Sequence, residues 1–226
     1  MKITLNPLIF GVLTIALASA AVGNTITLAT YGTGQNANGA DNSPLAYLGY
    51  DATTPVLVGV GSGTTYNLTW GLAPWAGPIG GSNWVSEDPN STVGLGSAPP
   101  NGYYTYTSTF SATPGVYTGN LDVYGDDTAE VFLNGRLVVP FDTNTTNSPC
   151  ALDHNGPPCI GSPFQVSFTA NLGLNNVLTV VDWQSDGSAA GIDLKGTLAA
   201  TPEPGSLLLL ATGLVGTVRL VGRKAR

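Results

Sequence analysis

Short runs of β-forming residues, several of them alternating apolar with polar, fill the chain between residues 24 and 200, separated by clusters of Gly, Pro, Asn and Asp. No long stretch there keeps the 3.6-residue period of a helix, whereas a period of two is typical of strands. The intervening residue types end strands and form turns. We therefore predict about ten strands, at residues 25–30, 55–60, 64–70, 103–110, 120–125, 128–133, 136–141, 164–170, 176–183 and 192–198.

The clearest local pattern is a hairpin. Ala129, Val131 and Leu133 alternate with other residues and predict one buried strand face. Asn134-Gly135 follows, and this pair suits a tight type I′ turn because both positions must accept positive φ. Residues 136–141 are expected to return as the partner strand.

About ten strands in a chain of 226 residues predict an all-β fold: a single jelly-roll or two-sheet β-sandwich. Residues 36–50 and 71–100 are expected to be long irregular loops. We expect a signal helix over residues 1–20, the sandwich over 21–200, and a membrane helix within 201–226.

The N-terminus has the layout of a secretory signal. Lys2 precedes an apolar stretch at residues 8–17, and Ala18-Ser19-Ala20 offers small residues for cleavage after Ala20. A transmembrane helix needs a longer apolar run. The sequence thus predicts export and processing by a signal peptidase.

The C-terminal segment could be a permanent anchor, a sorting tag or a terminal helix of the fold. Its apolar run, residues 205–218, would span only about 21 Å as a helix, against about 30 Å of membrane hydrocarbon. Arg219 ends the run and can reach toward the cytoplasmic surface, together with the basic residues near the chain end: Arg223, Lys224 and Arg226. The extended Pro202-Glu203-Pro204 link disfavours a terminal helix of the fold.

The formal net charge is -7, and Arg136 and Lys195 are the only basic side chains between residues 24 and 200. A domain with so few cations and a net negative charge repels phosphate backbones, so nucleic acid is excluded as a partner. Cys150 and Cys159 are the only cysteines. In an exported chain we expect them to form a disulfide, since with a single His they match no zinc pattern.

Catalytic patterns are nearly absent, and we expect no enzyme. The sequence contains no G-x-S-x-G nucleophile elbow whose serine the single histidine, His154, could activate. Carboxylates could supply a glycosidase acid and base or a structural calcium site: Asp122, Asp126, Asp127, Glu130, Asp182 and Asp186. Asp126-Asp127, however, also reads as a simple turn, so the metal ligands stay unknown and no cofactor is required.

Four tryptophans leave a sugar-stacking surface open as a hypothesis. Trp75 and Trp84 lie in predicted loops, where exposed indoles could contact a sugar ring. Trp70 and Trp183 adjoin predicted strands and are expected in the core. Packing of all four is the competing interpretation.

The last residues resemble the PEP-CTERM sorting signal: Pro202-Glu203-Pro204, then "LLLLATGLVG", then a basic tail. Proteins of that family occur in Gram-negative bacteria that make exopolysaccharide. The resemblance implies recognition by an exosortase-type membrane protease, passage through the inner membrane, and delivery to the cell surface, outer envelope or extracellular matrix. Early Arg219 departs from the usual uninterrupted apolar run.

Residues 83–198 resemble the galactose-binding-like β-sandwich, through "NWVS", "YYTYTSTF", "GDDTAEVFLNG" and "NVLTVVDWQSDGSAAGIDLKGTL". This resemblance implies a fold more than a ligand. Three hypotheses follow: an exported non-catalytic surface or matrix protein associated with exopolysaccharide, a carbohydrate-binding module with a defined sugar site, and, more weakly, an extracellular glycoside-active enzyme.

Overall fold

The computed structural model describes residues 25–34, 44–68, 75–91, 99–141, 156–185 and 189–201. Residues 25–199 form one compact unit, and residues 1–24 with 200–226 form another. The described residues contain strands and no helix, so none of them provides a helix that could span a membrane. The expected signal and C-terminal helices lie outside the described residues.

Eleven strands are described in the compact unit. They are β1 (Thr25–Ala29), β2 (Ala46–Asp51), β3 (Tyr66–Asn67), β4 (Val85–Ser86), β5 (Gly102–Ser111), β6 (Gly115–Asp126), β7 (Thr128–Leu133), β8 (Arg136–Val139), β9 (Phe164–Leu172), β10 (Asn175–Gln184) and β11 (Gly191–Ala200).

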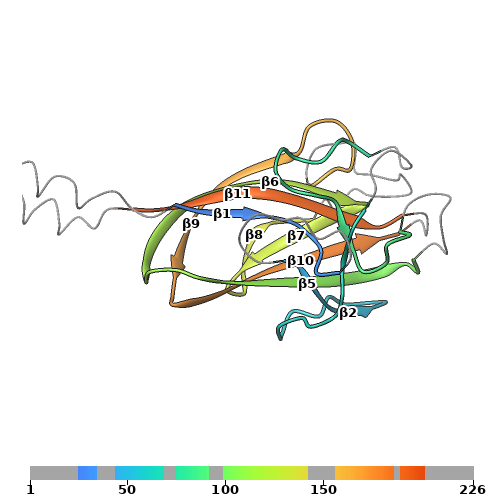
Figure 1. Ribbon diagram of the computed structural model, residues 1–226, viewed down its shortest axis with the longest axis horizontal. Coiled ribbons are helices and arrows are strands. Elements are labelled where there is room, and N and C mark those ends of the chain that lie inside the picture. The colour runs from blue at the N-terminus through green and yellow to red at the C-terminus, as the bar shows by residue number, and fades with distance from the viewer. Residues whose placement is uncertain are drawn as a thin grey trace, which may run out of the picture. The chain divides into compact units, whose positions relative to one another are not determined.

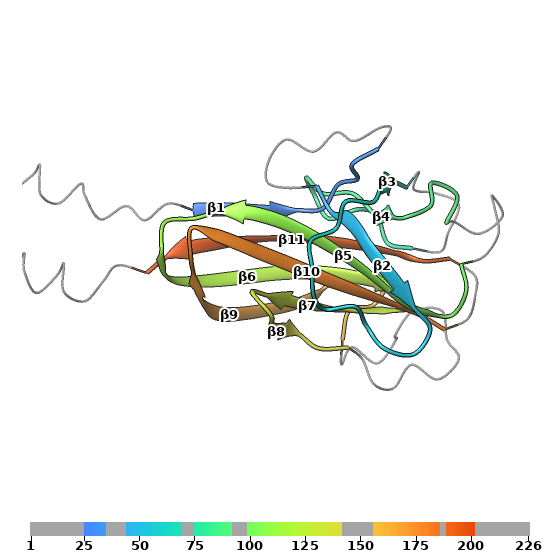
Figure 2. The same cartoon turned by 90° about the horizontal axis from the view of Figure 1, so that it is seen from below.

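The strands form two sheets that face each other. One sheet has six strands in the order β3-β4-β11-β6-β9, with β1 also paired to β11, and the other has five in the order β2-β5-β10-β7-β8. Figure 1 shows β1, β6 and β11 in the layer above β5, β10 and β2. Figure 2 shows β10 between β5 and β7. The prediction of an all-β sandwich is confirmed.

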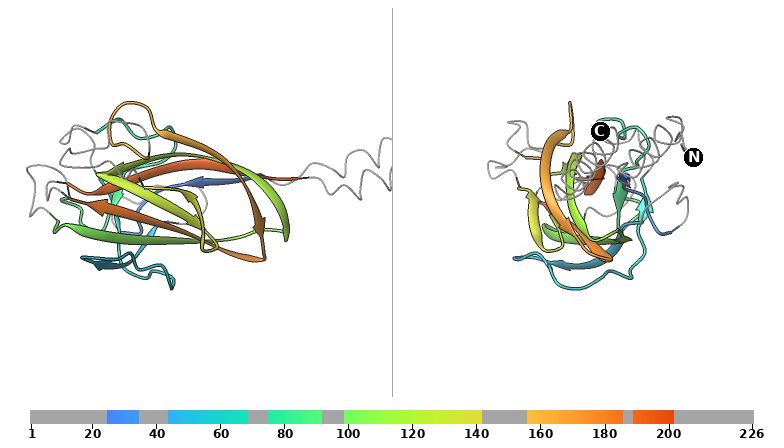
Figure 3. Two further views of the ribbon diagram at one scale, coloured as in Figure 1. Left: turned by 180° about the vertical axis from the view of Figure 1, so that it is seen from behind. Right: turned by 90° about the vertical axis from the view of Figure 1, so that its left-hand side faces the viewer.

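The core lies between the sheets, where alternate residues of each strand point inward. In β6, Leu121 and Val123 are buried, whereas Thr118 and Asn120, which lie nearer the start of the strand, are exposed. Val131 and Val180 face them from the other sheet and are fully buried. Each such side chain contributes roughly 1.5–3 kcal/mol through burial. The end-on view in Figure 3 shows the strands curving around this shared interior.

The Asn134-Gly135 hairpin is confirmed. Both residues have positive φ, 52° and 77°, as the type I′ turn requires. Asn134 Oδ1 also accepts a hydrogen bond of 2.9 Å from the Val177 N–H. The turn therefore joins β7 and β8 and also attaches to β10.

The strand predicted at residues 55–60 is wrong. This segment is an irregular loop, and Val58 is 89% exposed. Its apolar run does not alternate, Pro55 has no N–H to pair, and Gly59 has φ 124°. The stretch predicted to be irregular, 36–50, instead contains most of β2.

Candidate functional site

Three of the predicted carboxylates come together where β6 ends. Asp126 is the last residue of β6, Asp127 links it to β7, and Asp182 lies near the end of β10. All three are at most 2% exposed. We call this group the carboxylate end. Because the carboxylate end is buried, the hydrogen bonds of its three carboxyl groups decide whether any of them could act on a ligand.

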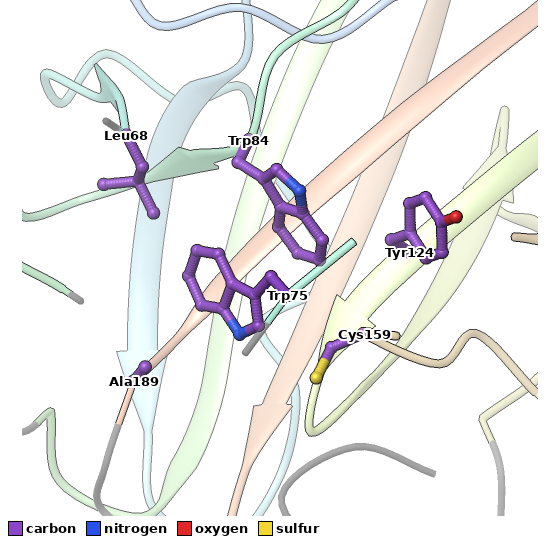
Figure 4. Packing of buried hydrophobic residues seen from close by; sticks show 6 residues of the cluster. All are labelled: Leu68, Trp75, Trp84, Tyr124, Cys159 and Ala189. Carbon is purple, nitrogen blue, oxygen red and sulfur yellow. The ribbon is translucent and has the colours of Figure 1, made fainter. Parts of the chain in front are cut away.

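Asp126 is held by a tryptophan. The Trp75 Nε1–H donates a hydrogen bond of 2.6 Å to Asp126 Oδ2. Trp75 stacks on Trp84 at 4.4 Å between ring centroids, and Trp84 stacks on Tyr124 at 5.6 Å. Figure 4 shows these rings within a small apolar group, the tryptophan cluster: Leu68, Trp75, Trp84, Tyr124, Cys159 and Ala189.

For Trp75 and Trp84 the structure contradicts the hypothesis of an exposed sugar-stacking surface and supports the competing interpretation, packing. Trp75 is 5% exposed and Trp84 is fully buried, with its Nε1–H donated to the Ala76 carbonyl at 3.0 Å. The loop around them folds onto β6, because Tyr124 on the outward face offers an aromatic surface to cover. Neither indole presents a face on which a sugar ring could stack.

Asp127 ties the β6–β7 turn to the end of β10. Its Oδ2 accepts hydrogen bonds from the Ser185 backbone N–H at 2.7 Å and from the Ser185 hydroxyl. Its own N–H donates to the Trp183 carbonyl at 3.0 Å. The prediction of a turn at Asp126-Asp127 is confirmed, and the carboxylate serves the local structure.

Asp182 is the exception among these acids. It lies opposite Tyr104 and Ala129 on the face of β10 that points into the sandwich. Neither carboxyl oxygen has a hydrogen-bond partner of accepted geometry among the described residues. Burial first, and then the charges of Asp126, Glu87 and Asp127, raise its pKa well above the usual value, while the Gly191 N–H lowers it by less. Its surroundings therefore disfavour the charged form of Asp182.

Asp193 is a second buried acid that the sequence analysis did not single out. It accepts hydrogen bonds from the Thr30 hydroxyl at 3.0 Å, the Ser82 hydroxyl at 2.5 Å and the Ile79 N–H at 2.7 Å. Burial raises its pKa, and these hydrogen bonds oppose that rise. The residue fastens the loop around Ile79 to β11; an acid inside an apolar strand was the only signal.

The other candidate acids lie apart from the carboxylate end. Asp122 accepts a hydrogen bond of 2.9 Å from Gln165 Nε2 between β6 and β9. Glu130 follows Ala129 on β7; because Ala129 pairs with Asp182, Glu130 points to the other face of the sheet. Burial raises the pKa of Glu130 to about 7. Trp183, expected in the core, is half-buried. Asp186, His154 and Trp70 lie outside the described residues.

The described residues hold no group of three or more His, Cys, Asp or Glu side chains that could bind a metal. The possible structural calcium site therefore has no such ligand set in this part of the chain. Cys159 is fully buried in the tryptophan cluster. Cys150 lies outside the described residues, so the disulfide stays a prediction.

Residues 200–225 match the model of the PEP-CTERM protein-sorting motif. This match confirms the motif recognised in Pro202, Glu203 and Pro204, which themselves lie outside the described residues. The motif indicates export, membrane transit and sorting to the cell surface by an exosortase-type membrane protease. None of the curated protein sequences matches the chain.

Solved structures give distant likenesses. A β-glucosidase from Kluyveromyces marxianus is 19% identical, over 47% of this chain and 12% of that one, with a TM-score of 0.29. A GH26-CBM35 β-(1,4)-mannanase from Podospora anserina is 16% identical, over 81% and 29%, with a TM-score of 0.36. A family 35 carbohydrate-binding module from Clostridium thermocellum is 16% identical, over 60% and 91%, with a TM-score of 0.30. The chain thus spans only a small part of both enzymes, and at these TM-scores the likenesses decide nothing about function.

Proposed function

We propose that this chain is an exported, non-catalytic surface protein of a Gram-negative bacterium, sorted by an exosortase and associated with extracellular polysaccharide. The observation that carries the proposal is the sorting motif at residues 200–225, which begins where β11 ends. The sandwich is then the delivered part, and residues 201–226 direct its delivery. Residues 1–20 would be removed by a signal peptidase after export.

The carboxylate end supports a non-catalytic role. A carboxyl group with a raised pKa beside a second carboxylate is the pairing that glycosidases use. The acid must, however, reach the glycosidic oxygen of a substrate, and Asp182 is fully buried between the sheets. Asp126 and Asp127 bond to Trp75 and Ser185 within the fold. Asp126 and Asp127 thus stabilise loops instead of facing a ligand.

The sorting step is tested with the Pro202→Ala/Glu203→Ala/Pro204→Ala variant in a strain that carries the matching exosortase. The wild-type protein should reach the surface with a mass that lacks residues 205–226, whereas the variant should stay in the inner membrane at its longer mass. A mature surface protein that keeps residues 205–226 would refute removal of the tail.

Association with polysaccharide is tested by cell fractionation. The surface protein should sediment with the exopolysaccharide of the wild-type strain and appear in the medium of a strain unable to make that polymer. Equal retention in both strains would refute the association while leaving the sorting step intact.

A further inference from the structure

A groove crosses the outer face of the six-stranded sheet, on the side away from the core. It has a volume of about 440 Å³ and lies where β6 runs between β11 and β9. Its polar lining includes Thr118, Asn120, Ser167, Thr169 and Thr197. No sequence motif marks this site, because its residues come from three separate strands.

Strand alternation sends hydroxyl and amide groups into the groove. Thr118 and Asn120 are exposed, whereas Tyr117 and Leu121 beside them point into the core and are 1% exposed. Ser167 and Thr169 of β9 are also exposed.

The register aligns these polar groups across the strands. Thr118 lies opposite Thr169, and Asn120 lies opposite Ser167. The result is two polar rows, about 7 Å apart along the strands, with neighbours about 5 Å apart within a row.

One amide in the groove is already oriented. Asn120 Oδ1 accepts hydrogen bonds of 3.1 Å from both the N–H and the hydroxyl of Thr197. Its Nδ2 group therefore points away from Thr197, with two hydrogens to donate. A fixed donor reduces the entropy lost when a ligand binds.

The groove lining carries no charged side chain. Two charged side chains lie close to the lining, and both already have partners: Asp122 accepts a hydrogen bond from Gln165, and Arg136 donates to the backbone carbonyl of the lining residue Thr169 at 2.9 Å. Lys195 of β11 bonds to the Gly80 carbonyl. An anionic polymer would find no cation in the lining and would approach a chain of net charge -7.

We propose that this groove binds a neutral, hydroxyl-rich polysaccharide as an extended chain. Sugar hydroxyls both donate and accept hydrogen bonds, as do the threonine, serine and asparagine side chains that line the groove. The inference rests on the proposed polysaccharide association and adds its location and the charge class of the polymer.

The test is affinity electrophoresis of the full chain, kept in solution by detergent. The gels contain dextran, laminarin, galactomannan or the anionic polymer alginate. At least one neutral polymer should retard the wild-type protein, and alginate should not. Thr118→Ala/Thr169→Ala and Asn120→Ala should each weaken that retardation about tenfold, since each removes hydrogen bonds to the ligand.

Thr109→Ala is the matched control, because Thr109 is exposed on β5 of the other sheet. It should bind as the wild type does, and unchanged melting temperatures should show that all variants are folded. Equal binding by the groove variants and the wild type, or retardation by alginate alone, would overturn the proposal that the groove binds a neutral polysaccharide. If the protein still sediments with native exopolysaccharide in those cases, the proposed function stands and only the groove fails.

Discussion

Trp75 and Asp126, 51 positions apart in the chain, meet through a buried hydrogen bond of 2.6 Å between the indole Nε1–H and Oδ2. The bond fixes a loop residue to the last residue of β6. It also explains why this tryptophan is buried: its ring packs on Trp84 and its one polar atom has a carboxylate to bind.

Trp75→Phe should lower the free energy of unfolding by about 2–3 kcal/mol, because the buried hydrogen bond to the Asp126 side chain is lost and the ring shrinks. Urea unfolding of Trp75→Phe, Asp126→Asn and the double variant measures the coupling, which should be about 1 kcal/mol or more. Trp183→Phe, on a half-buried tryptophan, is the control and should cost less. Additive single effects would contradict the bond's contribution.

Asp182 should make stability fall as the pH rises. Its folded-state pKa lies well above the unfolded value of about 3.9, so the folded state binds the proton more tightly. The resulting stabilisation is complete below about pH 3.9 and is lost as the pH rises through the folded pKa. Asp182→Asn cannot titrate, so its stability relative to wild type should increase with pH. Parallel pH profiles of the two proteins would show that Asp182 is not the cause.

Glu130 offers a titration that can be observed directly. Burial raises its pKa to about 7, above an unfolded value of about 4.3. Its contribution to stability is therefore complete below about pH 4.3 and is lost as the pH rises through about 7. Carboxyl-carbon NMR should show a midpoint near 7 that disappears in Glu130→Gln. Asp51, which is partly exposed, is the internal control, because hydrogen bonds from Thr53 and Thr54 lower its pKa. A Glu130 midpoint near 4 would contradict the prediction.

Gly135→Ala should lower the free energy of unfolding by about 1 kcal/mol. An added Cβ would meet no atom within 4 Å, so the cost comes only from the φ of 77°. Gly115→Ala, at a glycine for which no positive φ is recorded and whose nearest neighbour would lie 4.0 Å away, is the matched control. Equal effects of the two changes in urea unfolding would refute the role of the turn conformation.

The sequence was most informative where one strand face is apolar. Residues 128–133 were predicted as a strand, and β7 has those bounds, because Ala129, Val131 and Leu133 alternate with more polar neighbours. The Asn134-Gly135 turn was equally clear, since few residue pairs accept positive φ at both positions. The continuous apolar run at residues 55–60 was misleading, because it forms a largely exposed loop.

The burial of Trp75 and Trp84 could not be read from the sequence. It depends on a loop folding over Tyr124, a contact between segments about 40 and 50 residues apart. The same holds for Asp193 of β11, whose partners come from the loop at Ile79 and Ser82 and from Thr30, which directly follows β1. Local patterns predict strands and turns, whereas these contacts arise only when distant segments pack together.

The pairing of β1 with β11 has a mechanical consequence. Thr25 lies opposite Ala199, and β11 is held by β6 along one edge and by β1 and β4 along the other. A pull on the chain beyond Ala200 runs along β11, so the hydrogen bonds on both edges resist together in shear instead of opening one at a time. A protein held by its C-terminal end could thus bear the drag of an attached polymer without β11 being peeled away.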